Sequence, residues 1–67
     1  MQGVVARIIS EKGFGFIKAS GSGKEFFFHR STVTSPGGYN GLHEGDLVTF
    51  EPAQGLKGPR AEDVRQA

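Results

Sequence analysis

Hydrophobic residues tend to occupy every second position in five short segments of the chain, and this pattern predicts β-strands. Because neighbouring side chains of a strand point to opposite faces, a period of two gives each strand one apolar and one polar face. The predicted strands cover residues 3–9, 14–19, 24 or 25 to 29, 46–51 and 60–64. Glycine-rich turns separate them, and no stretch has helical periodicity beyond a single turn. We therefore expect an all-β chain, a small five-stranded antiparallel OB-fold barrel.

The alternation is imperfect in the first predicted strand, where Val5 and Ile8 cannot both face the core of a regular strand. We therefore expect a β-bulge or a strong twist there, as in other small barrels. Pro52 has no backbone N–H, so it either ends the fourth strand or marks an edge of the sheet. In the fifth strand, Ala61 and Val64 are expected to face inward.

The second predicted strand has an unusual distribution of aromatic residues. Phe14 and Phe16 share one face, and Gly15 and Ile17 share the other. If the phenylalanines faced the core, Ile17 would be exposed to water. We therefore predict that Ile17 is buried and that the two phenylalanines are exposed, where only a ligand would make them favourable.

The third predicted strand repeats this arrangement. Phe26 and Phe28 share a face suited to the core, while Phe27 and His29 share the opposite face. An antiparallel pairing of the two strands through the turn at 21–23 would join their outer faces. The resulting exposed patch comprises Phe14, Phe16, Phe27 and His29. Exposed aromatic residues interleaved with Lys and Arg predict binding of single-stranded RNA or DNA, with stacking worth about 1–3 kcal/mol per base.

These segments resemble a known family. Residues 12–17 and 26–29 are similar to the first and second ribonucleoprotein motifs of cold-shock domains. The resemblance continues through Gly3, Ser31, Leu42-His43-Glu44-Gly45 and Lys57-Gly58-Pro59-Arg60-Ala61. It implies a non-enzymatic protein that binds single-stranded RNA or DNA, as an RNA chaperone or a regulator of transcription or translation. An RNA-recognition motif would need helices and the opposite order of the two motifs.

The chain departs from the family pattern at several aromatic positions. Arg7 stands where cold-shock domains usually have Trp, Ile8 replaces the following aromatic residue, and Arg30 replaces a Phe. Arginine can stack on bases and also reach phosphate, so the resemblance implies a site with less stacking and more charge. Tyr39 stands where the family has a loop aromatic. It either stacks on a base or packs down to shield the mouth of the barrel.

The distribution of charge supports this location of the site. The net charge is only +1, but residues 1–43 carry five basic and two acidic side chains, whereas residues 44–67 carry three basic and five acidic ones. The positive charge therefore lies with the aromatic residues. The complete predicted site comprises Arg7, Lys12, Phe14, Phe16, Lys18, Phe27, His29, Arg30, Tyr39 and Lys57.

Composition excludes several other classes of function. The chain has no cysteine and only two histidines, so we expect no disulfide, no metal site and no small-molecule cofactor. No apolar run could span a membrane, and a single cytoplasmic, monomeric domain over residues 1–67 is the default expectation. His29, Arg30 and Ser31 lack an acidic orienting group, so catalysis is not expected. The remaining alternative is a small β-barrel that holds a protein partner with the same aromatic patch.

Overall fold

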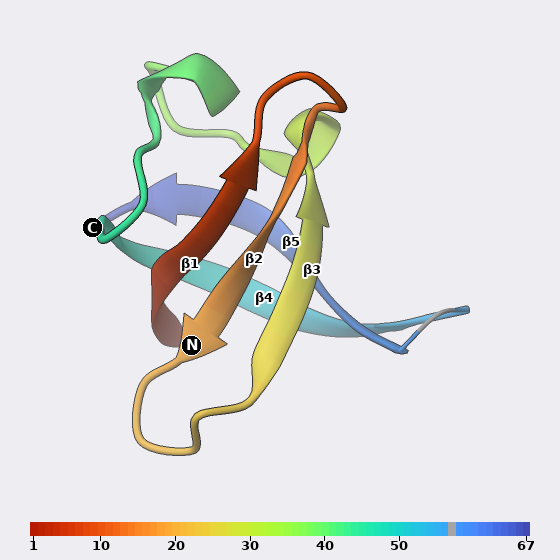
Figure 1. Cartoon of the computed structure of the whole chain (residues 1–67). Helices are drawn as coiled ribbons and strands as arrows, with labels where there is room; N and C mark the ends of the chain where they lie inside the picture. The colour runs from red at the N-terminus through yellow and green to blue at the C-terminus, as the bar shows by residue number, and fades with distance from the viewer. Residues whose placement is uncertain (57) are drawn as a thin grey trace.

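The computed structural model describes residues 1–56 and 58–67 and contains five strands and two short 3₁₀ turns. The strands are β1 (Gln2–Ile9), β2 (Phe14–Ala19), β3 (Glu25–His29), β4 (Leu47–Gly55) and β5 (Gly58–Gln66), and the turns are η1 (Arg30–Thr32) and η2 (Tyr39–Gly41). The strands close into a barrel in the order β1-β2-β3-β5-β4 (Figure 1). The predicted all-β barrel is confirmed.

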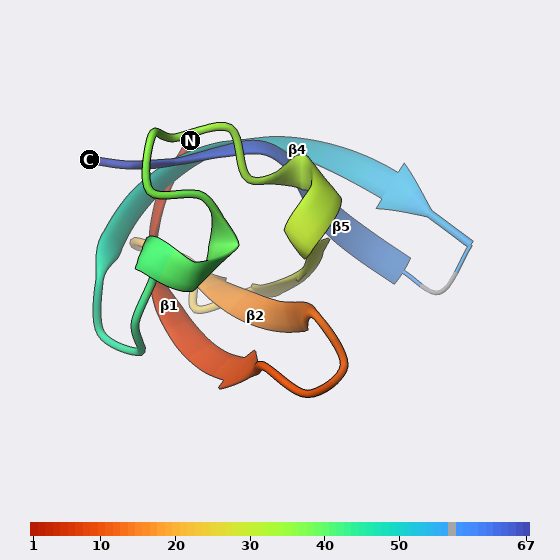
Figure 2. The ribbon, with the colours of Figure 1, turned by 90° about the horizontal axis from the view of Figure 1, so that it is seen from above.

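One seam of the barrel differs from the expected antiparallel arrangement. β3 and β5 run parallel where they meet, with Phe27 opposite Arg60, while the other strand pairs are antiparallel. A parallel bridge between Val33 and Val64 extends this seam beyond η1. The connection from β3 to β4 crosses one end of the barrel (Figure 2), so β4 starts at the end where β3 stops. β5 then returns toward that end and runs parallel to β3.

The core contains the residues that the alternation assigned to it in β2, β3 and β5, together with Val48 and Phe50 of β4. Ile17, Phe28, Val48 and Val64 are fully buried, and Phe26, Phe50 and Ala61 are nearly so. Gly15 faces inward beside Phe28, where a Cβ atom would lie 2.5 Å from the carbonyl oxygen of Arg7 and 2.8 Å from the Phe28 ring. The glycine is therefore what lets β1 approach β2 over the largest core side chain.

The expected bulge lies in β1 between Val5 and Arg7, where the register with β2 shifts by one residue. It lets buried Val5 be followed by Arg7 on the outer face, opposite Phe16, while Ile8 is half-buried against the core. β4 is longer than predicted and continues through Pro52 to Gly55. β4 pairs with β1 only over Leu47–Thr49, so the missing N–H of Pro52 lies on an edge, as one of the two expectations had it.

A side-chain cluster on the outside of β5 should make the stability of the fold depend on pH in the acidic range. Asp63 has a positive φ of 51°, and its Oδ1 accepts hydrogen bonds from Thr34 Oγ1 at 2.8 Å and Arg65 Nε at 3.3 Å. The hydrogen bond from Thr34, reinforced by Arg65, lowers the pKa of the Asp63 carboxyl below its ordinary value of 3.8. This contribution to stability is therefore present above the ordinary value and is lost as the pH falls through the lowered one.

We expect the Asp63→Asn variant to lose less of its melting temperature than the wild type between pH 5 and acid conditions below the ordinary carboxyl pKa. Asn tolerates the left-handed backbone, so the substitution tests the charge rather than the conformation. Thr34→Val, which removes the hydroxyl donor, should reproduce part of the effect. If the melting temperatures of the wild type and both variants changed with pH in the same way, the stabilising role of the Asp63 carboxylate would be contradicted.

Candidate nucleic-acid interface

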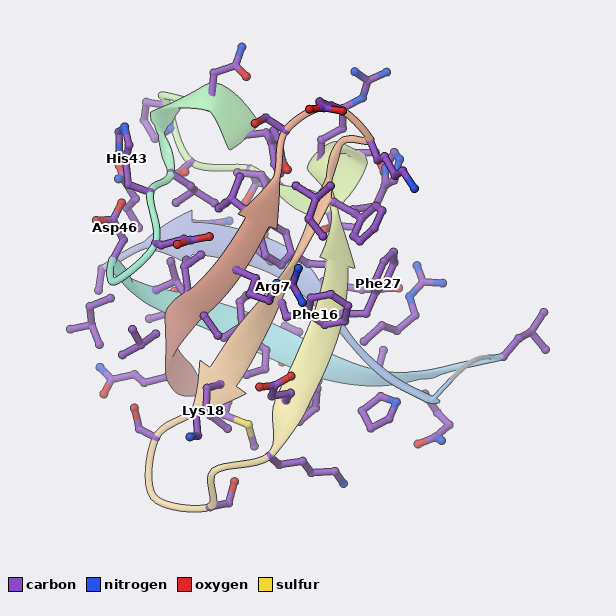
Figure 3. All side chains as sticks on the ribbon, viewed as in Figure 1. Arg7, Phe16, Lys18, Phe27, His43 and Asp46 are labelled. Carbon is purple, nitrogen blue, oxygen red and sulfur yellow. The ribbon has the colours of Figure 1, made fainter. Side chains whose placement is uncertain are left out.

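Three phenylalanines form a continuous exposed surface, which we call the aromatic platform: Phe14, Phe16 and Phe27. Their ring centroids lie 5.4 to 6.0 Å apart, and the rings meet in tilted and edge-to-face arrangements. The register of β2 with β3 produces this cluster by placing Phe16 opposite Phe27. Figure 3 shows Phe16 and Phe27 projecting from the same side of the barrel.

The predicted facing of the aromatic residues is confirmed. Phe27 is 38% exposed, whereas its chain neighbours Phe26 and Phe28 are 5% and 0% exposed. Phe14 and Phe16 are half-buried, since each ring covers part of the other. A cluster of apolar rings on an outer face is typical of a surface that a ligand covers.

His29 extends the platform at one end, opposite Phe14 in the β2–β3 ladder. Its Nδ1 accepts a hydrogen bond from the backbone N–H of Ser31 at 3.2 Å and lies 2.9 Å from the Ser31 hydroxyl. An acceptor Nδ1 assigns the proton of the neutral ring to Nε2. The exposed ring thus offers a stacking face and one outward N–H donor to a ligand.

Basic side chains border the platform on several strands. Arg7 lies opposite Phe16 on β1, and Lys18 follows Phe16 on the same face of β2 (Figure 3). Arg60 of β5 lies opposite Phe27 across the parallel seam and forms a 2.9 Å ion pair with Glu62. Lys12 is exposed in the turn before β2. Lys57, also predicted for this site, lies outside the described residues.

The platform forms one wall of a groove with a volume of about 580 Å³. The other wall is the far end of the β4–β5 hairpin, where Leu56 is fully exposed. The groove is lined by Phe14, Phe16, Phe27, Gly55, Leu56, Gly58, Pro59 and Arg60. Sequence reasoning missed Leu56, Pro59 and Arg60 as site residues. The only available signal for Pro59 and Arg60 was the string at residues 57–61, from which only Lys57 was assigned to the site.

Tyr39 is not part of the platform. Its ring packs 6.1 Å from the buried Phe28, and its hydroxyl donates a 2.6 Å hydrogen bond to the carbonyl oxygen of Phe14. Burial raises the pKa of the Tyr39 phenol above its ordinary value of 10.0, against the smaller opposing effects of a backbone hydrogen bond and the positive charge of Arg30. Of the two roles left open by the sequence, the structure has the packed one, with Tyr39 closing the mouth of the barrel.

Arg30 lies just beyond the end of the platform. It follows His29 but begins η1, and its side chain lies over Gly13 rather than over the phenylalanine rings. The two arginines that depart from the family pattern therefore occupy different surroundings: Arg7 lies beside Phe16, and Arg30 lies at the end of the barrel near Tyr39.

Other kinds of site find no support in the part of the chain that the structure describes. These residues bring together no group of three His, Cys, Asp or Glu side chains able to hold a metal ion. Among the described residues there is also no helix that is long and apolar enough to cross a membrane.

Comparison with known proteins agrees with this geometry. The family model described as the 'Cold-shock' DNA-binding domain matches residues 1–67. Cold shock protein ScoF of Streptomyces coelicolor is 48% identical over 97% of this chain and 96% of its own length. Cold shock-like protein CspB of Bacillus cereus is 44% identical over 96% of this chain and 95% of its length. Cold shock protein CspA of Staphylococcus aureus is 43% identical over 94% of this chain and 92% of its own length.

A solved structure supports the assignment of the fold. The structure described as drosophila Unr CSD456 superimposes with a TM-score of 0.79 at 24% sequence identity and covers 98% of this chain. The chain in turn spans 26% of that longer chain. The likeness confirms the predicted OB-fold barrel.

Proposed function

Because this chain belongs to the cold-shock domain family, whose members bind nucleic acids and are not enzymes, we propose that its aromatic platform binds single-stranded RNA or DNA. The observation that carries the proposal is the cluster of three mutually contacting, outward-facing phenylalanines. Phe14, Phe16 and Phe27 supply stacking faces for successive bases, and His29 adds a fourth face with a hydrogen-bond donor.

Electrostatic attraction to the backbone accompanies stacking. Arg7 and Lys18 border the platform on one side and Arg60 on the other, so phosphates of a strand lying across the rings meet positive charge on both sides. The ion pair between Arg60 and Glu62 is about half exposed, and a phosphate can replace the carboxylate without burying a charge. Acidic partners are therefore favoured over the proline-rich peptides that small β-barrels also bind.

This mode of binding would keep transcripts unfolded. Bases that stack on phenylalanine rings cannot stack and pair within a hairpin, so binding shifts the equilibrium towards the open strand by mass action. We propose this RNA-chaperone activity as the role of the protein, acting as a monomer in the cytoplasm. Regulation of transcription or translation would follow where the opened structure controls either process.

The proposal predicts selective and moderately salt-dependent binding. We expect single-stranded homopolymers to bind much more tightly than a duplex, because duplex bases are already stacked on each other. With three to five neutralised phosphates, the slope of log K against log salt concentration should be about −2 to −3.5, at roughly −0.7 per phosphate. Fluorescence titrations at several salt concentrations measure both. Equal binding of duplex, or tighter binding of a proline-rich peptide, would refute the proposal.

A substitution at Arg7 tests how much charge and stacking each contribute to binding affinity. We expect Arg7→Trp to strengthen binding at high salt and to make the salt slope shallower by about 0.7, because the variant exchanges one cation for a larger stacking face. Arg65→Trp is the matched control, since Arg65 lies on the outside of β5 and is paired with Asp63. A salt slope that Arg7→Trp leaves unchanged would place Arg7 outside the binding surface.

A further inference from the structure

A second pocket lies next to the aromatic platform, at the end of the barrel that holds Tyr39. It has a volume of about 260 Å³ and is formed by Ser10 and Gly13 of the β1–β2 turn, Arg30 of η1 and residues 37–40. Figures 1 and 2 show that this turn, η1 and η2 gather at the same end of the barrel. Pockets for drug-sized ligands usually span about 300–1,000 Å³, so this one suits a smaller group. We call it the Arg30 pocket.

The fold holds the Arg30 side chain in this pocket. The backbone N–H of Arg30 donates a 2.8 Å hydrogen bond to the carbonyl oxygen of Gly13. The methylene stem of Arg30 lies so close to Gly13 that a Cβ atom there would be 3.0 Å from Arg30 Cδ. Gly13 also has a positive φ of 74°. The glycine thus provides both the turn and the space that the arginine stem occupies.

The groups that line the Arg30 pocket are suited to an anion. The salt bridges found in the described part of the chain involve other basic groups, and none pairs Arg30 with a carboxylate. Ser10 contributes a hydroxyl and Asn40 a side-chain amide, and neither makes a side-chain hydrogen bond to another described residue. The hydroxyl of Tyr39 is already used by Phe14, so the cation, the hydroxyl and the amide are the groups left for a ligand.

The Arg30 pocket also continues the line of the platform. Gly13 directly precedes Phe14, and Arg30 directly follows His29. Phe14 and His29 are opposite each other in the ladder and form the last pair of the aromatic surface. A strand that stacks along Phe16 and then Phe14 therefore runs toward the β1–β2 turn, where Gly13 and Arg30 line the pocket.

We propose that the Arg30 pocket binds a phosphate group of the bound single strand, so that this end of the site recognises charge instead of a base. The proposal rests on the proposed function of the platform. The planar guanidinium suits bidentate binding of phosphate oxygens, and the serine and asparagine donors complete the contacts. The phosphate is either the terminal group of a strand that ends at His29 or a bridging phosphate of a longer strand.

The test compares thymidine hexanucleotides that carry a 5′-phosphate, a 3′-phosphate or only hydroxyl ends, together with a dodecanucleotide. For a terminal phosphate, we expect one phosphorylated hexamer to bind the wild type about 5- to 20-fold more tightly than the unmodified hexamer at low salt. For a bridging phosphate, the phosphorylated hexamers should bind like the unmodified one, and the gain should appear with the dodecanucleotide. In Arg30→Gln either gain should vanish, and Arg30→Lys should retain part of it.

The control is Arg65→Gln, which removes the same charge from a residue that does not line the pocket and should retain the wild-type gain. Melting curves establish that each variant is folded. If Arg30→Gln keeps the full gain, or if Arg65→Gln loses as much of it, the phosphate pocket is refuted while the platform stands. If Phe16→Ala does not weaken binding of the unmodified hexamer, the proposed function itself fails, and the pocket proposal with it.

Discussion

Phe28→Ala should lower the free energy of unfolding by about 3–5 kcal/mol, the range for removing a large aromatic side chain from a packed core. Phe28 is 0% exposed, lies against Gly15 and packs 6.1 Å from Tyr39. The remaining cavity cannot close easily, because β3 is paired with β2 on one side and with β5 on the other. At about 0.05–0.15 kcal/mol per residue, a chain of this length has little stability to spare. Urea denaturation at 25 °C should show the variant unfolding at a much lower urea concentration than the wild type.

The neighbouring Phe27 is the matched control for this substitution. Phe27→Ala removes the same ring from the outer face of the same strand, where Phe27 is 38% exposed. We expect a loss of less than about 1 kcal/mol, because exposed substitutions leave no cavity. If Phe27→Ala unfolded the protein and Phe28→Ala spared it, the inward and outward faces of β3 would be assigned the wrong way round.

Phe16→Ala and Phe27→Ala should each weaken binding of a single-stranded oligonucleotide by about 1–3 kcal/mol, the usual contribution of one stacked base. Phe16 and Phe27 lie opposite each other with ring centroids 5.9 Å apart, so they present one shared surface. The effects in the double variant should therefore differ from the sum of the single effects, as is usual for residues in contact. Binding titrations at high salt measure the stacking contribution, because salt screens the attraction between basic side chains and phosphates.

A substitution at an exposed apolar residue away from the platform distinguishes base stacking from nonspecific hydrophobic binding. Leu47 on β4 is 49% exposed, more than Phe27, and lies opposite Val4 on β1. Leu47→Ala should leave the affinity for oligonucleotides unchanged. Loss of affinity in Leu47→Ala equal to that in Phe16→Ala would contradict a stacking site on the platform.

Side-chain alternation alone was sufficient to predict the outer surface of β2 and β3. The burial of Ile17 rather than Phe16 follows from the period of two within one strand. Because a short glycine-rich turn joins the two strands, their pairing involves only residues close together in the sequence. The platform and the buried Phe28 could therefore be predicted without a structure. The bulge in β1 could be predicted for the same reason, since the spacing of Val5 and Ile8 conflicts with a regular strand.

The closure of the barrel and the far wall of the groove were decided only by tertiary structure. Arg60 reaches the platform through the parallel seam between β3 and β5, a contact between segments far apart in the chain that no periodicity encodes. Leu56 and Pro59 line the groove because that seam carries the β4–β5 hairpin beside Phe27. Long-range pairing of this kind depends on the whole core, so residues without a local pattern could not be assigned to the site in advance.

Tyr39 and Arg30 show the same division at the other end of the barrel. Their positions in the sequence were compatible with stacking on a base, but the conformation of the loop around Gly38 and Tyr39 places the phenol over Phe28 and against the carbonyl of Phe14. Arg30 then occupies the space above Gly13. The sequence by itself determined which strand faces are aromatic, and the packing of the loop against the core decided which of the remaining residues could join them.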